Sequence, residues 1–307
     1  MKHVIASYNM SWASATGLFK DDVDKRRSKP SEAGFLRRAR KKHEFWQNAF
    51  DHLMSFIKKK EPSVIGLQEM IQDNPGGLQI INAVKDDYYH LLYCVSGACI
   101  LTLWKKSLGK IDKKYSVDLE KGRPMSIIYT TKKYLLINLH APHLNRDAYS
   151  VIRKYLLINL NPSYSHNGLA DLIDIHFKRF VGTISEPLDS SKIYIMGDFN
   201  YDGINRSHPF ILNDSIRLST GTDREIKSCC YGSKATTPHD YPRGGDYCLG
   251  QYPVVPLHII PSPIGSDHGS IASDHELVSA TFRTKSGSVT RKRPRINLRK
   301  TSSDVQS

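Results

Sequence analysis

The chain consists of short apolar runs separated by polar breaks, and most of these runs have the length and composition of β-strands. The first run, His3–Tyr8, ends at the polar residue Asn9. The same pattern predicts further strands at Val64–Leu67, Tyr88–Tyr93, Ala98–Trp104, Met125–Thr130, Tyr134–Leu139, Ile193–Met196, Tyr247–Leu249, His258–Ile260 and Glu276–Phe282.

A second pattern, with apolar residues three and four positions apart, predicts helices. It is clearest between His43 and Lys60, where the recurring apolar residues are Phe45, Trp46, Ala49, Phe50, Leu53, Phe56 and Ile57. We expect Arg37–Lys42 to open this helix after a loop at Lys29–Glu32, and Pro62 to prevent its continuation. Helical patterns also cover Asp147–Leu160 and Leu169–Val181.

Strands alternate with helices near both ends of the chain, and the middle contains a series of strands that looks antiparallel. Elements of these kinds bury their apolar faces against one another in layers. We therefore expect an α/β (α+β) fold, a four-layer α/β sandwich in which two packed mixed β-sheets are flanked by helices. With 307 residues, of which 39% are apolar, the chain is long enough for one large layered domain.

The net charge of +14 is concentrated in two stretches. Residues 20–60 hold 13 Lys and Arg against 6 Asp and Glu, and residues 283–300 hold 8 Lys and Arg and no acid. These two surpluses account for all of the net charge, so the rest of the chain is nearly neutral. Localised basicity is expected of a surface that binds a polyanion such as nucleic acid. A solvated basic helix with a basic tail is the alternative, and the charge alone leaves both open.

We expect a catalytic domain at residues 1–282, with a basic insertion at about 11–42, followed by a basic, disordered tail at 283–307. Five cysteines, an odd number, argue against a disulfide framework. Cys229, Cys230, His239 and Cys248 lack the usual zinc-ligand spacing, so ordinary thiols are expected there.

No apolar stretch of 18 residues is present, so a membrane span is not expected, and neither is an obligate protein partner. We expect an intracellular protein. Arg291–Arg295 favours the nucleus if that basic run is a targeting signal, and the cytoplasm is expected otherwise.

Polar residues with catalytic potential follow or interrupt the predicted strands. A single such residue is more often a cap or a turn residue, but a series in this order is hard to explain that way. The residues are Asn9, Glu69, His140, Asp198, Asn200, Asp246, Asp274 and His275.

The segments that contain these residues resemble, in order, those of the endonuclease/exonuclease/phosphatase superfamily, which has the DNase-I-like fold. The resemblance covers residues 3–282. The matching segments are Ser7–Asn9, Ile65–Glu69, Ile137–His140, Gly197–Asn200, Gly245–Tyr247 and Ser273–His275.

The resemblance implies a metal-dependent phosphodiesterase site. Glu69 would be the principal ligand of Mg²⁺, for which Mn²⁺ would substitute, and Asn9 and Asp274 would lie beside it. Asp198 would orient or deprotonate the attacking water, and Asn200 would donate its amide to the phosphate.

The histidines have separate roles in this resemblance. His275 would contact the scissile phosphate while Asp246 fixes its tautomer, and His140 would assist the leaving group or the phosphate. Arg123 and Tyr201 are further candidates for contact with substrate.

The tripeptide Ser273–His275 has a second copy at Ser266–His268. The later copy is followed by a strand-like run, whereas the earlier one is followed by a segment that is unsuited to the closing strand. We therefore assign the site to the later copy and expect Asp267 and His268 to be loop residues.

The sequence thus predicts a divalent-metal-dependent hydrolase, first of all a nuclease acting on DNA or RNA as an endonuclease. One alternative is a phosphoesterase acting on a nucleotide, an RNA end, or a phospholipid or sphingolipid headgroup. Another is a non-catalytic module that binds nucleic acid. Localised positive charge favours the nuclease, because neutralising several backbone phosphates away from the cut benefits such an enzyme.

Overall fold

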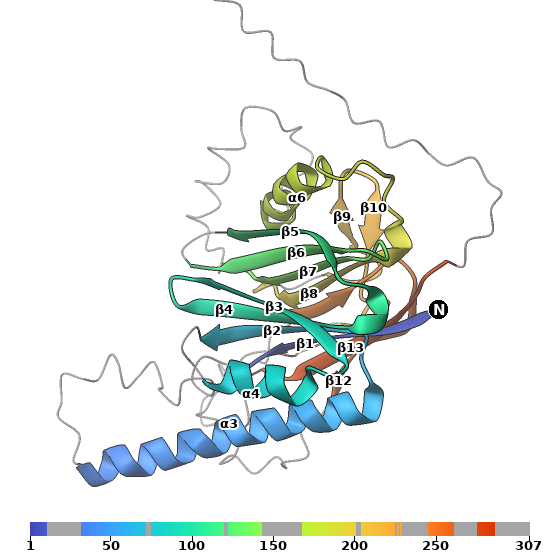
Figure 1. The fold of residues 1–307 in the computed structure, drawn as a ribbon. Helices are drawn as coiled ribbons and strands as arrows, with labels where there is room; N and C mark the ends of the chain where they lie inside the picture. Colours follow the sequence, from blue (N-terminus) through green and yellow to red (C-terminus); the bar gives the residue numbers. More distant parts are fainter. Residues whose placement is uncertain are drawn as a thin grey trace, which may run out of the picture.

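Two β-sheets pack face to face, and helices cover their outer faces (Figure 1). A computed structural model describes residues 1–10, 32–71, 75–119, 122–142, 168–200, 204–224, 226, 228, 245–260 and 275–285. The helix α3 (Glu32–Lys60) and the helix α4 (Pro75–Val84) lie on one side of the molecule, and α6 (Gly168–Val181) lies on the other (Figure 1). The four layers predicted from the sequence are confirmed.

The first sheet has six strands and is antiparallel except for its central pair, β1 and β2, which is parallel. The closing strand β13 lies antiparallel to β1, so the two ends of the fold meet in one sheet. In spatial order the strands are β12 (Pro253–Ile260), β13 (Leu277–Arg283), β1 (Lys2–Asn9), β2 (Val64–Ile71), β4 (Ala98–Lys105) and β3 (Tyr88–Val95).

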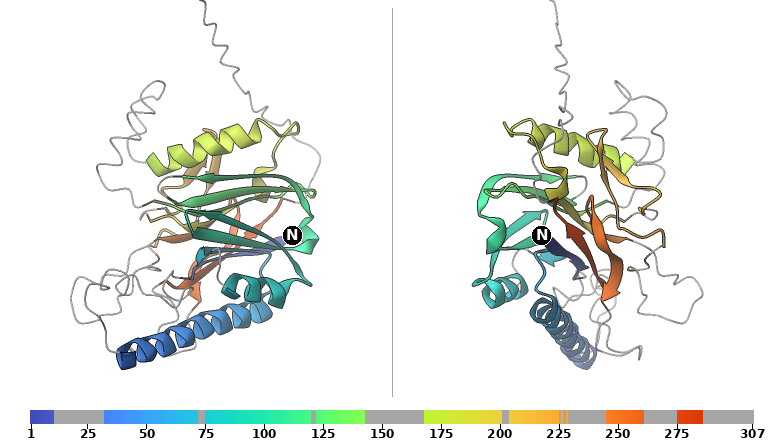
Figure 2. Two further views of the ribbon diagram at one scale, coloured as in Figure 1. Left: turned by 60° about the vertical axis from the view of Figure 1, so that its left-hand side comes forward. Right: turned by 90° about the vertical axis from the view of Figure 1, so that its right-hand side faces the viewer.

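The second sheet has five strands and also contains one parallel pair, β7 and β8. Its spatial order is β11 (Asp246–Leu249), β8 (Ile193–Asp198), β7 (Leu135–His140), β6 (Pro124–Thr130) and β5 (Ile111–Asp118). A small ribbon of β9 (Phe210–Leu212) and β10 (Ile216–Leu218) lies on the α6 side (Figure 2).

Several boundaries and elements differ from the sequence predictions. Helix α3 begins at Glu32, before the predicted opening at Arg37, so Glu32 is helical and not part of a loop. The pattern did not predict α4, whose first residues are Pro75-Gly76-Gly77. It also missed β5, an edge strand in which polar residues are frequent because only part of each face is buried. The predicted helix Asp147–Leu160, most of the insertion at 11–42 and nearly all of the tail lie outside the described residues.

One disulfide corrects a further prediction. The odd number of cysteines argued against a disulfide framework, but Cys94 and Cys99 are bonded across the β3–β4 hairpin. Their pairing could not be inferred from the cysteine count, because it follows from the hairpin register. Cys248 is a buried free thiol, as expected, whereas Cys229, Cys230 and His239 lie outside the described residues. Within the described part of the chain, no helix combines the length and the apolar character that crossing a membrane requires.

A polar network crosses the otherwise apolar layer between the sheets. Gln68 on β2 donates from Nε2 to Asn138 Oδ1 on β7 at 2.8 Å and accepts from Ser7 Oγ at 3.2 Å. Asn138 Nδ2 in turn lies 3.1 Å from Thr102 Oγ1 and 3.2 Å from the Leu101 carbonyl oxygen, both on β4. These side chains are fully buried, and their mutual hydrogen bonds offset the cost of removing them from water. We call Ser7, Gln68, Thr102 and Asn138 the seam network.

Gly66 on β2 allows the sheets to approach at this network. A Cβ atom at Gly66 would lie 2.3 Å from Met196 Cγ and 2.7 Å from Asn138 Oδ1. Gly66→Ala should therefore lower the free energy of unfolding by about 1–3 kcal/mol, the usual cost of overpacking a core, as measured by urea denaturation.

Gly77→Ala in α4 is the matched control, because its Cβ would meet Met70 Cε at an ordinary contact distance of 3.6 Å. Removing a glycine from a helix should stabilise the protein by roughly 0.5–1 kcal/mol. Equal stability of the two variants would contradict tight packing of the sheets at Gly66.

Candidate metal and catalytic site

Polar side chains from both sheets gather at one end of the sandwich. Strands β1 and β2 end there, as do β7 and β8, because each pair is parallel. The antiparallel strands β11 and β13 begin at the same end. As a result, Asn9, Glu69, His140, Asp198, Asp246 and His275 meet at one edge although they are spread from residue 9 to residue 275.

Glu69 is placed by a β-bulge in β2. Leu67 pairs with Leu101 and Met70 pairs with Cys99, so three residues of β2 advance against two of β4. The extra residue keeps Met70 in the core beneath α3 and α4 and lets Glu69 leave that face. Glu69 has a φ of 56°, a left-handed conformation that is unusual for a non-glycine residue. Such a residue is typical of functional sites, where surrounding structure holds the strained backbone.

His140 and Asp198 face each other at the ends of the parallel strands β7 and β8, where they form a register pair. His140 Nε2 lies 3.6 Å from Asp198 Oδ2 and also 3.6 Å from Glu69 Oε1. His140 and Asp198 are almost completely buried, whereas the Glu69 side chain keeps 25% of its surface exposed. Glu69 therefore lies at the mouth of this cluster.

A second cluster pairs His275 with Asp246. His275 Nδ1 lies 2.9 Å from Asp246 Oδ2, and both side chains are buried. This contact favours the tautomer in which Nδ1 carries the hydrogen and donates it to the carboxylate. His275 Nε2 then points back to the centre, 3.9 Å from Asp198 Oδ2.

Asn9 and Asn200 bind Asp198 from two sides. Asn9 Nδ2 donates to Asp198 Oδ2 at 3.0 Å and lies 3.4 Å from His275 Nε2. The backbone N–H of Asn200 donates to Asp198 Oδ1 at 2.9 Å, and its side-chain Nδ2 donates to the Ala141 carbonyl at 2.7 Å. One amide hydrogen of Asn200 thus shapes the loop after β8. Donation to a phosphate stays a prediction that would use the other hydrogen.

Arg123 brings a positive charge to the same edge. It stands in the turn between β5 and β6, where its backbone N–H donates to Asp118 Oδ1 at 3.0 Å. Its guanidinium Nη1 contacts both ring nitrogens of His140, 3.0 Å from Nδ1. The sequence suggested Arg123 only as a candidate for phosphate contact, and the structure places it beside the predicted catalytic histidine.

Two predicted residues, Asp274 and Tyr201, lie outside the described residues, as does the second tripeptide copy at 266–268. All other predicted site residues converge. Gln68 and Asn138 had no predicted role, although both stand within the quoted motifs. Ser228 was not predicted either; its Oγ accepts from the Asp246 N–H at 3.1 Å and its carbonyl accepts from the Glu276 N–H at 2.7 Å. No local pattern marks Ser228, because its partners are far away in sequence.

Burial dominates the electrostatics of Asp198. Removal from water raises the pKa of its carboxyl from 3.8 to about 7. The nearby His275 lowers this pKa, Asp246 raises it, the N–H of Asn200 lowers it, and Glu69 raises it. In the absence of a cation, burial therefore disfavours the charged form of this carboxyl group.

The donor set fits a divalent cation. Ligand atoms of Glu69, His140 and Asp198 all lie within 4.8 Å of one another, and the same holds for Asp198, Asp246 and His275. Carboxylates placed this close repel each other unless a positive charge lies among them. Among the described residues no donor reaches Asp246 Oδ1, which is buried, so this oxygen also favours an added cationic or hydrogen-bonding partner.

Fold and site together define a class of protein: a two-sheet α/β sandwich that carries a buried carboxylate–histidine centre at one sheet edge. The sequence model that describes the "Endonuclease/Exonuclease/phosphatase family" matches residues 7–304 of this chain. The chain therefore belongs to the endonuclease/exonuclease/phosphatase family, and the resemblance stated from the sequence is confirmed.

Solved structures show the same fold at low sequence identity. Truncated Caenorhabditis elegans TDP2 is 13% identical with a TM-score of 0.57, covering 92% of this chain and 98% of that one. TDP2 from D. rerio, "complexed with single strand DNA product", is 16% identical with a TM-score of 0.53, covering 92% and 99%.

A Bacteroides vulgatus endonuclease/exonuclease/phosphatase is 13% identical with a TM-score of 0.56, covering 93% of this chain and 100% of that one. No curated protein matches the sequence. Membership of the family and these folds together support an enzyme of the phosphodiesterase or nuclease type.

The raised pKa of Asp198 predicts a pH dependence of stability without metal. Because the folded protein binds this proton more tightly than the unfolded chain, the group stabilises the fold below pH 3.8, and that contribution is lost as the pH rises through about 7. Asp198→Asn should remove this loss. The melting temperature in EDTA should fall less between pH 4 and pH 8 in the variant than in the wild type, and parallel curves would contradict a shifted pKa.

Proposed function

We propose that the protein is a divalent-metal-dependent phosphodiester hydrolase that cleaves a nucleic-acid strand, in the first place as an endonuclease. The observation that carries this proposal is the position of Asp198, which joins the Glu69–His140 cluster to the Asp246–His275 pair. A carboxylate with a metal on one side and an imidazole on the other is suited to in-line attack of water on a phosphodiester.

In this proposal Glu69 is the principal metal ligand, with Asn9 and Asp274 beside it. Mg²⁺ is the cofactor and Mn²⁺ its substitute, because hard oxygen donors dominate the set. The cation would stabilise the negative charge that develops on the phosphate oxygens. The exposed side of Glu69 faces the solvent from which the metal and the substrate arrive.

The remaining residues act on water and phosphate. Asp198 accepts a hydrogen bond from the attacking water and orients it, and burial makes this carboxylate a stronger base than an exposed one. In its protonated form His275 donates from Nε2 to the scissile phosphate while Asp246 holds its Nδ1–H. Arg123 and His140, which contact each other, would add positive charge and a proton donor for the leaving oxygen. Asn200 and Tyr201 contact the phosphate and the substrate.

Nucleic acid is the proposed substrate for two reasons. The positive charge of the chain is concentrated at residues 20–60 and 283–300, which includes most of the insertion at 11–42. Several phosphate contacts away from the cut would use such charge. The likeness to D. rerio TDP2, whose structure contains a single-strand DNA product, adds support. We propose residues 1–282 as the catalytic domain and 283–307 as a basic tail that adds affinity for the polyanion.

Substitutions test the roles of the site residues. His275→Ala should lower kcat by about 10²–10⁴-fold, because it removes both the phosphate contact and a proton donor. Glu69→Gln should weaken activation by Mg²⁺ by roughly 10–100-fold or more, measured as the concentration that gives half-maximal rate. His208→Ala is the control, since this histidine is exposed and its backbone forms hydrogen bonds with Asn205. Mg²⁺-dependent cleavage that survives both site changes would refute the assignment.

Cleavage assays on a panel of substrates test which class of phosphodiester the protein hydrolyses. We expect supercoiled plasmid or structured RNA to be nicked in Mg²⁺, with no cleavage in EDTA. Phosphoinositides, sphingomyelin, oligoadenylate and RNA ends are included as alternatives. Cleavage confined to RNA ends or to a lipid headgroup would replace the endonuclease proposal with the phosphoesterase one. Salt-sensitive DNA binding without cleavage of any substrate would identify a non-catalytic module.

A further inference from the structure

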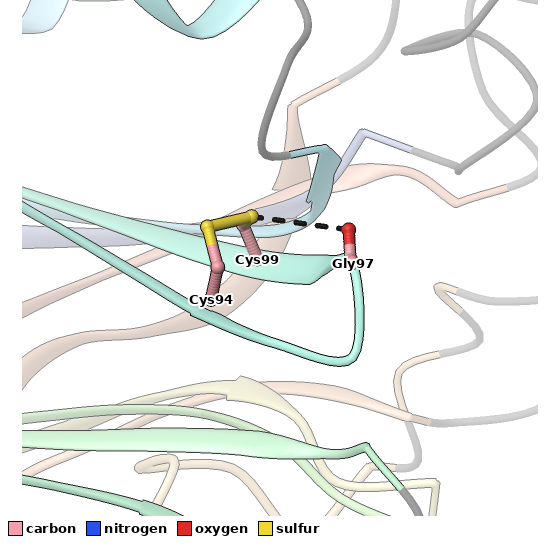
Figure 3. Close-up of a disulfide and its surroundings, with 3 residues drawn as sticks. All are labelled: Cys94, Gly97 and Cys99. Atoms are coloured by element: carbon pink, nitrogen blue, oxygen red, sulfur yellow. Dashed lines mark hydrogen bonds between the residues drawn. A yellow bond between two sulfur atoms is a disulfide. The ribbon is translucent and has the colours of Figure 1, made fainter.

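The disulfide between Cys94 and Cys99 lies on the hairpin that supports the bulge at Glu69. Figure 3 shows it bridging the two arms of the hairpin next to the turn at Gly97. Cys99 is also the register partner of Met70, the residue that directly follows Glu69. One end of the disulfide therefore lies opposite the β2 residue next to the proposed metal ligand.

The turn of the same hairpin contacts the other side of the site. A Cβ atom at Gly122 would lie 3.3 Å from Ser96 Cβ, so the β5–β6 turn packs directly on the β3–β4 turn. Gly122 immediately precedes Arg123, which contacts His140. The hairpin end therefore adjoins two segments that place Glu69 and Arg123, one on each side of the candidate site.

We propose that Cys94 and Cys99 form a reversible thiol–disulfide modification site, whose oxidised state fixes the Glu69 bulge and thereby strengthens metal binding. This inference rests on the proposed role of Glu69 as a metal ligand. The proposed reaction partners of the two cysteines are dithiol reductants and glutathione.

The hairpin register keeps both sulfur atoms together in either state. Cys94 and Cys99 are direct partners across β3 and β4, and Ser96 and Gly97 form the two-residue turn with positive φ values of 49° and 85°. Such a turn fixes the register without a covalent bond. Cys99 Sγ also lies 3.9 Å from the Gly97 carbonyl oxygen, which can accept the thiol hydrogen once the disulfide is reduced. Reduction therefore leaves the hairpin intact.

The bond closes only a short loop, since the two cysteines are five residues apart. A short loop restricts the unfolded chain less than a long one, so the disulfide contributes comparatively little to global stability. Its main effect is local. The bond joins β4, which pairs with the bulge in β2, to the outer strand β3. It therefore limits separation of these strands at the end of the sheet where β2 carries Glu69.

The exchange reaction is balanced by a dithiol reductant. Cys99 is fully buried and Cys94 is partly exposed, so the reductant thiolate attacks the Cys94 sulfur. A mixed disulfide forms at Cys94 and the Cys99 thiolate leaves and takes up a proton. The second thiol of the reductant then displaces Cys94, which also takes up a proton. Two electrons pass to the protein, and the reductant becomes a cyclic disulfide. Oxidised glutathione reverses the reaction in the same two steps.

The test measures Mn²⁺ affinity of the full chain by calorimetry before and after reduction with dithiothreitol. We expect the dissociation constant to rise on the order of tenfold on reduction, as for groups that support a metal ligand from outside, and to recover with oxidised glutathione. Alkylation and mass spectrometry should show two new thiols at Cys94 and Cys99, while the melting temperature changes little.

The matched control is the double variant Cys94→Ser/Cys99→Ser, which keeps the other three cysteines. It should have the weak affinity in both conditions and no response to dithiothreitol. An equal Mn²⁺ affinity of oxidised and reduced wild type would overturn the proposal, as would a response that persists in the double variant. Glu69→Gln separates this outcome from failure of the proposed function: if that change leaves Mn²⁺ affinity intact, the metal assignment itself is wrong.

Discussion

The hydrogen bond between the buried amides of Gln68 and Asn138 is the interaction on which the arrangement of the two sheets and of the site depends. It joins β2 to β7 across an apolar layer, where a lost partner would cost about 1–3 kcal/mol. Sliding one sheet against the other would break this hydrogen bond. Glu69 directly follows Gln68, and His140 follows Asn138 by two positions. The pairing that sets the offset of the sheets therefore also sets the separation of the carboxylate and the imidazole at their edge.

A site assembled in this way holds its groups in fixed positions, and it lowers the stability of the fold. Its groups stand at the ends of paired strands, so little of their position is left to side-chain freedom, and the electrostatic field at the edge exists before any substrate arrives. The same arrangement places Asp198 beside Asp246 and away from water, where burial and the neighbouring carboxyl group raise the pKa of Asp198. The buried carboxyl groups therefore lower the stability of the fold at this edge. The hydrogen-bonded side chains of the seam network, below the site, do not have this cost.

The parts of this structure that the sequence predicts are those with a local signature. Strands that end in Asp198 or His140 have one, and so does the ordered series of motifs that indicated the family. Strand β5 and helix α4 escaped prediction because partial burial and adjacent glycines blur the periodic pattern. The bulge at Glu69, the Cys94–Cys99 pairing and the contacts of Ser228 depend on strand register between distant segments, which a pattern of apolar positions does not specify. Asp274 and Tyr201 remain predictions.

The closing strand has a consequence for anything attached to the domain. Lys2 pairs with Arg283, and the Thr284 N–H donates to the Met1 carbonyl at 3.0 Å, so both ends of the folded unit lie together. They lie at the starting edge of β1, whereas the site occupies the edge where β1 finishes. A segment joined after Lys285 departs from the remote end of the sandwich. A domain fused at either end of the folded unit is therefore attached on the side away from the site, where it does not cover the reacting groups.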